Sequence, residues 1–148
     1  MTNRALIVVA GLSTSLALAG GLAAAGTAGV STGTKSSATV VIKHQMRGCH
    51  SWAVDGGAYR VAQTVRLARG GTIRFVDNDV MPHKLIQKSG PAVHYLGTPD
   101  MGRIGAFVKA TFPKAGTYTF ATKVGEDYMK GVKTMGEDNV LRLTVTVS

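Results

Sequence analysis

The stretch FVDNDVMPHKL, Phe75–Leu85, decides how this chain folds. It begins inside an alternating apolar and polar run, Thr72–Asn78, of the kind that forms a half-buried β-strand. The Asp and Asn residues that follow predict a turn, and Pro82 restricts the backbone just before His83. A second short strand is predicted over His83–Lys88. The unit is therefore a strand, a turn and a strand that begins with a histidine.

Other short strands are predicted on both sides of this unit. Each alternates apolar with polar residues and ends near glycine, proline or a polar turn. No stretch keeps a strong helical period over three turns. Many short strands with frequent turns predict an all-β fold, a Greek-key β-sandwich of about seven or eight strands. The further strands are expected at Ala38–His44, at Gln63–Gly71 with a Gly-Gly turn before Thr72, and at Phe107–Phe112, Thr117–Thr122 and Leu141–Val147.

A second informative segment, FPKAGTYTFATKVGEDYMKG, spans Phe112–Gly131. Together with Phe75–Leu85 it resembles the cupredoxins, small copper proteins such as plastocyanin and azurin. The matching features are the Asn/Asp turn with its Pro-His pair, the Phe-Pro and Ala-Gly-Thr-Tyr motifs, and a Met-Lys-Gly triplet. The resemblance covers most of the chain after the N-terminal region. It implies a mononuclear copper site in which His83 is the first histidine ligand and Met129 the axial methionine ligand.

The resemblance fails at two of the expected ligands. The cysteine of the family would fall at Thr122, and its second histidine would fall near Gly125. An extra segment, Lys133–Asn139, also delays the last strand. If the chain holds a copper–thiolate site, its thiolate and its second imidazole come from another part of the sequence.

Candidate replacements lie in KHQMRGCHSW, Lys43–Trp52, after the first predicted strand. In cupredoxins the loop between the first two strands lies at the same end as the ligand histidine, so Cys49 is predicted to replace the usual cysteine. Thiolate and imidazole are donors that suit copper. Cys49 is the only cysteine and cannot form an internal disulfide. The alternative for Cys49 is a buried, inert thiol.

Two histidines compete to be the second imidazole ligand. His44 continues the inward face of Val40 and Ile42, which favours it. His50 is next to Cys49, and neighbours in an extended chain point to opposite faces, so both bind one ion only if the loop bends. The predicted metal ligands are His83, Cys49, His44, His50 and Met129, with the choice between His44 and His50 open. Zinc is the rival metal, but a structural zinc site usually takes four Cys or His ligands, and CxxC or HxxxH spacing is absent.

Other potential donors have simpler interpretations. Glu126 lies where the family places ligands, but a glutamate is more often solvated. His94 has no partner motif and is interpreted as a surface histidine. Three methionines either fill gaps in the core or line the metal pocket as thioether donors: Met46, Met81 and Met101.

The N-terminal region has the pattern of a secretory signal peptide. A short positive start is followed by an uncharged run, Ala5–Thr34, and small residues offer cleavage sites after Ala25 or Ala28. We expect residues 1–28 to be a signal peptide, 29–37 a flexible linker and 38–148 the cupredoxin-like domain. The alternative is an uncleaved anchor, because the apolar run is long enough to span a bilayer. On either interpretation the protein is exported to the periplasm, the cell surface or the medium.

The chain is strongly basic, with 17 Lys and Arg against 8 Asp and Glu and a formal net charge of +9. The basic residues are scattered and aromatic residues are few, which argues against nucleic-acid binding. The charge suits an exported protein that meets acidic partners or associates peripherally with an anionic membrane surface. It does not determine the oligomeric state.

Enzyme chemistry has little support, because paired-carboxylate, Gly-x-Ser-x-Gly and Gly-rich phosphate motifs are absent. The leading hypothesis is an exported copper-binding protein with one copper ion at a Cys/His/Met site, used for electron transfer with a redox partner protein. One alternative is copper binding or delivery, in which the ion is exchanged with a copper donor or acceptor protein. The other is a metal-free interaction domain on the same fold.

Overall fold

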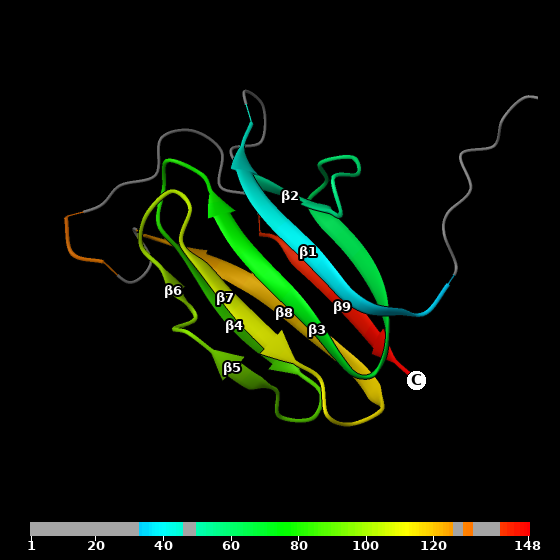
Figure 1. Ribbon diagram of the computed structural model, residues 1–148. Helices are drawn as coiled ribbons and strands as arrows, with labels where there is room; N and C mark the ends of the chain where they lie inside the picture. Colours follow the sequence, from blue (N-terminus) through cyan, green and yellow to red (C-terminus); the bar gives the residue numbers. More distant parts are fainter. Residues whose placement is uncertain (1–32, 46–49, 126–128, 132–139) are drawn as a thin grey trace, which may run out of the picture. The chain divides into compact units, whose positions relative to one another are not determined.

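Nine β-strands make up most of the chain that the structure describes (Figure 1). The structure is a computed structural model, and it describes residues 33–45, 50–125, 129–131 and 140–148. The predicted all-β fold is confirmed. The strands are β1 (Lys35–His44), β2 (His50–Val54), β3 (Ala62–Asn78), β4 (His83–Ser89), β5 (His94–Leu96), β6 (Asp100–Met101), β7 (Phe107–Thr111), β8 (Gly116–Val124) and β9 (Arg142–Val147).

The strands form two layers of a sandwich that share β3. In one layer β1 pairs with β2 and with the second half of β3, which also pairs with β7, and β7 pairs with β5. In the other layer the first half of β3 pairs with β9, which is followed by β8, β4 and β6. β3 runs parallel to β1 and to β9, whereas the other pairs are antiparallel. Parallel neighbours require crossovers between the layers, which is how a sandwich differs from a simple meander.

One long strand replaces the two strands and the turn that were predicted around Gly70 and Gly71. β3 pairs with β9 as far as Leu67 and with β1 and β7 from Thr72 onward. Gly70 has a φ of 78°, a left-handed conformation that glycine adopts without steric cost. A Cβ atom on Gly71 would lie 2.7 Å from the carbonyl oxygen of Ala68. The Gly-Gly pair therefore moves the strand from one layer to the other instead of ending it.

The structure contains three strands that the sequence analysis did not predict: β2, β5 and β6. In addition, β1 begins at Lys35 instead of Ala38. β2 does not alternate, because its first four residues are all buried. Its Trp52 is fully buried, and the indole N–H donates a hydrogen bond to the carbonyl oxygen of Val61. Part of the segment Lys43–Trp52, which was expected to form a loop after the first strand, thus belongs to β2, which starts at His50.

In the other strands, buried and exposed side chains largely alternate, and the buried ones form the core. The rings of Phe75 on β3 and Phe120 on β8 are fully or almost fully buried and lie 5.6 Å apart between the two layers. Phe112 packs edge-on against Tyr118 at 5.0 Å and against Phe120 at 5.9 Å. Burying each such side chain contributes on the order of 2–3 kcal/mol. The strands are thus held by a well-packed apolar interior.

One end of the sandwich gathers the ends of four strands. β1 and β3 are parallel, with Lys43 opposite Asn78, so both finish at this end. β2 starts there because it pairs antiparallel with β1, and β4 starts there after the turn that follows β3. His44, His50 and His83 are the terminal residues of β1, β2 and β4 at this end.

Candidate metal centre

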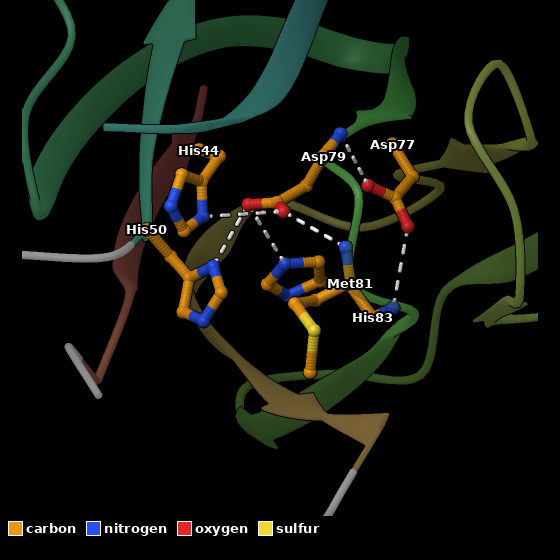
Figure 2. Close-up of polar contacts among 6 residues, drawn as sticks. All are labelled: His44, His50, Asp77, Asp79, Met81 and His83. Carbon is orange, nitrogen blue, oxygen red and sulfur yellow. Dashed lines mark hydrogen bonds and ion pairs between the residues drawn. The ribbon is translucent and has the colours of Figure 1, made fainter. Parts of the chain in front are cut away.

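The turn between β3 and β4 is built on Asp77, which is fully buried. Its Oδ1 accepts a hydrogen bond from the Asp79 backbone N–H at 3.0 Å, and its Oδ2 accepts one from the His83 backbone N–H at 3.2 Å. The first bond is the local turn contact that aspartate favours. The second spans the whole turn and fixes the backbone of His83 at the start of β4 (Figure 2).

Asp77 serves this turn at an electrostatic cost. Burial raises the pKa of its carboxyl to about 7, the hydrogen bonds from the two backbone N–H groups oppose the rise, and the charge of Asp79 adds to it. Both oxygens of Asp77 accept backbone hydrogen bonds. Its role is therefore to shape the turn that carries Asp79 and His83.

The β1–β2 hairpin brings two histidines to one face of the sheet. His44 and His50 are directly opposite each other in the antiparallel pair, and such residues project from the same face. Their ring centroids are 5.9 Å apart. His50 is fully buried, whereas the His44 side chain is 39% exposed. The inward direction predicted for His44 is therefore shared by His50, and His50 is the more deeply buried of the two.

Asp79 lies among all three histidines (Figure 2). It is 1% exposed, and its Oδ2 is hydrogen-bonded to His50 Nδ1 at 2.8 Å. The same oxygen lies 3.4 Å from His83 Nε2, and Oδ1 lies 3.6 Å from His44 Nδ1. These two longer distances describe electrostatic contacts more than well-formed hydrogen bonds. Oδ1 also accepts a hydrogen bond from the Met81 backbone N–H at 2.9 Å.

The charge of Asp79 follows from these contacts. Burial by itself raises the pKa of its carboxyl, but the hydrogen bond with His50, the close contact with His83 and the hydrogen bond from the Met81 amide outweigh burial and hold the pKa well below its ordinary value. The carboxylate is ionised at neutral pH. The end of the sandwich thus places one buried negative charge beside three imidazoles, an environment that favours a bound cation.

His83 gives the strongest indication that this cluster suits a metal ion. Its ring is fully buried and lies 4.6 Å from that of His50, with the ring planes at 86°. Neither of its ring nitrogens has a hydrogen-bond partner among the described residues, whereas buried polar atoms are nearly always paired. A metal ion would satisfy one of these nitrogens, and imidazole is a common ligand of copper and zinc.

The spacing of the neighbouring donors also suits one ion. Ligand atoms of His44, His50 and Asp79 lie within 4.8 Å of one another. Two ligands of one ion, each bound at about 2.1 Å, are separated by at most about 4.2 Å. Small side-chain movements would therefore let these groups share an ion.

Two more groups flank His83. Met101 on β6 is directly opposite His83 and fully buried, so both side chains project from the same face. Met101 also belongs to the apolar core, as its gap-filling interpretation implied. Thr122, at the position of the family's cysteine, is opposite Leu85 and only 9% exposed. Its hydroxyl oxygen has no hydrogen-bond partner among the described residues, but it supplies no thiolate.

The structure does not place the remaining candidate ligands in this cluster. Cys49, Met46 and Glu126 are outside the described residues. Met129 is 38% exposed, and its backbone N–H donates a hydrogen bond to the Gly125 carbonyl oxygen at 2.6 Å. The assignments of Cys49 and Met129 as metal ligands stay predictions.

Asp79 is the candidate that the sequence did not single out. It lies four residues before His83 in an Asp/Asn run that was interpreted only as a turn. Turn aspartates are usually exposed, so composition gives no reason to expect a buried carboxylate. The available clue was the Pro-His pair that follows, but only the fold shows that the turn is directed toward the β1–β2 hairpin.

The chain matches no protein-family model and no curated protein. Similar solved structures include a purple cupredoxin from Nitrosopumilus maritimus, at 18% identity and a TM-score of 0.42, covering 75% of this chain and 99% of that one. An amicyanin mutant in its Cu(I) form has 16% identity, a TM-score of 0.38 and coverage of 74% and 82%. A cysteine protease inhibitor from Entamoeba histolytica has 11% identity, a TM-score of 0.40 and coverage of 76% and 97%. Likenesses of this size carry no conclusion about ligand or activity. The chain itself forms the all-β sandwich that its sequence predicts.

Proposed function

We propose that this protein is an exported copper protein that holds one copper ion at this end of the sandwich and uses it for electron transfer. His83 and His50 would supply imidazole ligands, and Cys49, next to His50 in the sequence, would supply a thiolate. The observation that carries the proposal is the pair of fully buried rings 4.6 Å apart, one of which, His83, has no hydrogen-bond partner for either ring nitrogen among the described residues. His44 and Met129 are the further candidate ligands.

The chemical type of the proposed ligands and the backbone contacts that hold them both favour this function. Imidazole and thiolate together suit copper better than the hard oxygen-seeking metals. Bound copper would supply a one-electron redox couple. The protein would hold the ligands: the Asp77 carboxyl fixes the backbone of His83, and the β1–β2 ladder fixes that of His50. Ligands supported in this way would move little between two oxidation states, which favours fast electron exchange.

Copper delivery is the second candidate function, and the position of His44 supports it. The His44 side chain is 39% exposed, and its ring centroid lies 5.9 Å from that of the buried His50. An exposed imidazole beside a buried one offers an incoming or departing ion an intermediate ligand. The partner would then be a copper donor or acceptor protein instead of a redox protein.

A copper titration of the purified full chain separates these functions. We expect one copper per chain by metal analysis and, with Cu(II), an intense visible band from thiolate-to-copper charge transfer. Stoichiometric Cu(I) binding without a stable coloured Cu(II) form would favour delivery. Failure to retain stoichiometric copper in either oxidation state would contradict both functions and leave the metal-free interaction domain.

Export is a separate part of the proposal and rests on the N-terminal pattern. The described residues contain no helix of the length and apolarity needed to cross a membrane, and the run Ala5–Thr34 lies almost wholly outside them. We expect mass spectrometry of the exported protein to find a start near Gly26 or Gly29. An intact Met1 or Thr2 start in the membrane fraction would indicate an anchor instead. The net charge of +9 suits a partner with an acidic surface.

A further inference from the structure

The Asp79 carboxylate lies beside one ring nitrogen of His50 and one ring nitrogen of His83. Oδ2 of Asp79 lies 2.8 Å from His50 Nδ1 and 3.4 Å from His83 Nε2. In each ring the other nitrogen points away from Asp79 (Figure 2). The carboxylate and the candidate metal-binding nitrogens are therefore on different sides of these two rings.

An ionised carboxylate can only accept hydrogen bonds. The nitrogen of a neutral imidazole that faces Asp79 is therefore the protonated one, and the opposite nitrogen carries the lone pair. This gives an Nδ1–H tautomer at His50 and an Nε2–H tautomer at His83. The lone pair of His83 is then on Nδ1, the nitrogen on the side of the ring away from Asp79 (Figure 2). Neither nitrogen of this buried ring has a hydrogen-bond partner among the described residues, and Nε2 has only the 3.4 Å contact with Asp79.

We propose that Asp79 is the positioning residue of the copper site: it sets opposite tautomers in His50 and His83 and so selects His50 Nε2 and His83 Nδ1 as the metal-binding atoms. This inference rests on the proposed copper function. Histidine ligands commonly donate their second N–H to a carboxylate, which fixes the ring and makes the ligating nitrogen more basic. Asp79 supplies that partner to His50 through a hydrogen bond at 2.8 Å, and its negative charge lies 3.4 Å from Nε2 of His83.

The position of Asp79 is itself fixed by the backbone. Its Oδ1 accepts the Met81 N–H at 2.9 Å, and its own N–H donates to Asp77 at 3.0 Å. Both hydrogen bonds belong to the turn between β3 and β4. The carboxylate is thus held by the same turn that holds His83, so the two groups keep their relative orientation whether or not an ion is bound.

The geometry also bears on the oxidation state. A negative hydrogen-bond acceptor behind two imidazoles strengthens them as donors, which stabilises the more highly charged ion. Asp79 therefore favours Cu(II) over Cu(I). The competing arrangement makes Asp79 itself a metal ligand, together with one ring nitrogen each of His44 and His50, because the spacing of these groups permits it.

Nitrogen NMR of the full chain distinguishes the two arrangements. Long-range proton–nitrogen correlations identify the protonated nitrogen of each ring, both in the metal-free protein and in the diamagnetic Cu(I) form. We expect protonated His50 Nδ1 and His83 Nε2 in both states, with Cu(I) shifting His50 Nε2 and His83 Nδ1. The opposite tautomers, or Cu(I) on His50 Nδ1, would overturn the inference. If no copper binds, the proposed function fails, and the tautomers of the metal-free protein still decide the inference about Asp79.

Affinity measurements on Asp79→Asn give the second test. The variant keeps the side-chain volume and loses the charge, so we expect Cu(II) affinity to fall about 10–100-fold and Cu(I) affinity to fall less. The matched control is Asp55→Asn, which removes an exposed carboxylate that pairs with Lys35. Equal losses for Cu(I) and Cu(II), or unchanged Cu(II) affinity in the folded variant, would contradict the role of Asp79. The tautomers are measured on the unaltered chain, so they remain informative if Asp79→Asn fails to fold.

Discussion

Replacing His83 with alanine is expected to lower copper affinity by at least about a hundred-fold while the sandwich stays folded. Loss of a group that only supports a ligand typically costs 10–100-fold in metal affinity, so loss of a ligand costs at least the upper figure. His83 is the residue for which sequence and structure agree most closely. It follows the Asn/Asp–Pro turn, its backbone is bound by Asp77, and its buried ring lies against His50.

The fold should survive this change because the strand pairing of β4 uses backbone groups, which alanine retains. His83→Gln provides a second variant that keeps more of the side-chain volume. Competition titration with a chromophoric copper chelator measures affinity, and far-ultraviolet circular dichroism confirms the sandwich. The control is His94→Ala, which removes an exposed histidine on β5. A folded His83 variant with the affinity of the unaltered chain would refute the assignment.

Cys49→Ser is expected to remove the visible thiolate-to-copper band completely and to lower Cu(I) affinity sharply. Cys49 is the only thiol in the chain, so a copper–thiolate bond within one molecule must use it. A serine hydroxyl is a poor ligand for the soft Cu(I) ion, whereas thiolate suits it. Absorption spectra and copper affinity of Cys49→Ser, compared with the unaltered chain, measure both effects.

Alkylation gives an independent test of the same cysteine. An unbound thiol at this site should react with iodoacetamide, and a stoichiometric amount of Cu(I) should protect it. The metal-free and Cu(I)-loaded proteins are compared by mass spectrometry after equal exposure. Equal alkylation of the two samples would mean that Cys49 is not a ligand, and His83 with His50 would remain the central donors.

Some of the candidate site could be predicted because its information is local in the sequence. The Asn/Asp–Pro–His run identifies His83 as a residue at a strand end. A second short segment contains three potential metal ligands, His44, Cys49 and His50. Neither pattern shows which of these groups meet. The direct pairing of His44 with His50 became evident only with β2, a strand whose first four residues are buried and therefore show no alternation.

The sequence by itself determined that this is an all-β protein, where most of its strands lie and which of their residues face the core. These properties follow from a two-residue alternation that each strand carries on its own. Only the tertiary structure decided that β3 continues through Gly70 and Gly71 into a second layer, and that Asp79 lies among three histidines. Asp79 and His50 are 29 residues apart and meet because the turn after β3 lies beside the β1–β2 hairpin. Alternation specifies the face of a strand but neither its neighbour nor its register, so contacts between distant strands require the assembled fold.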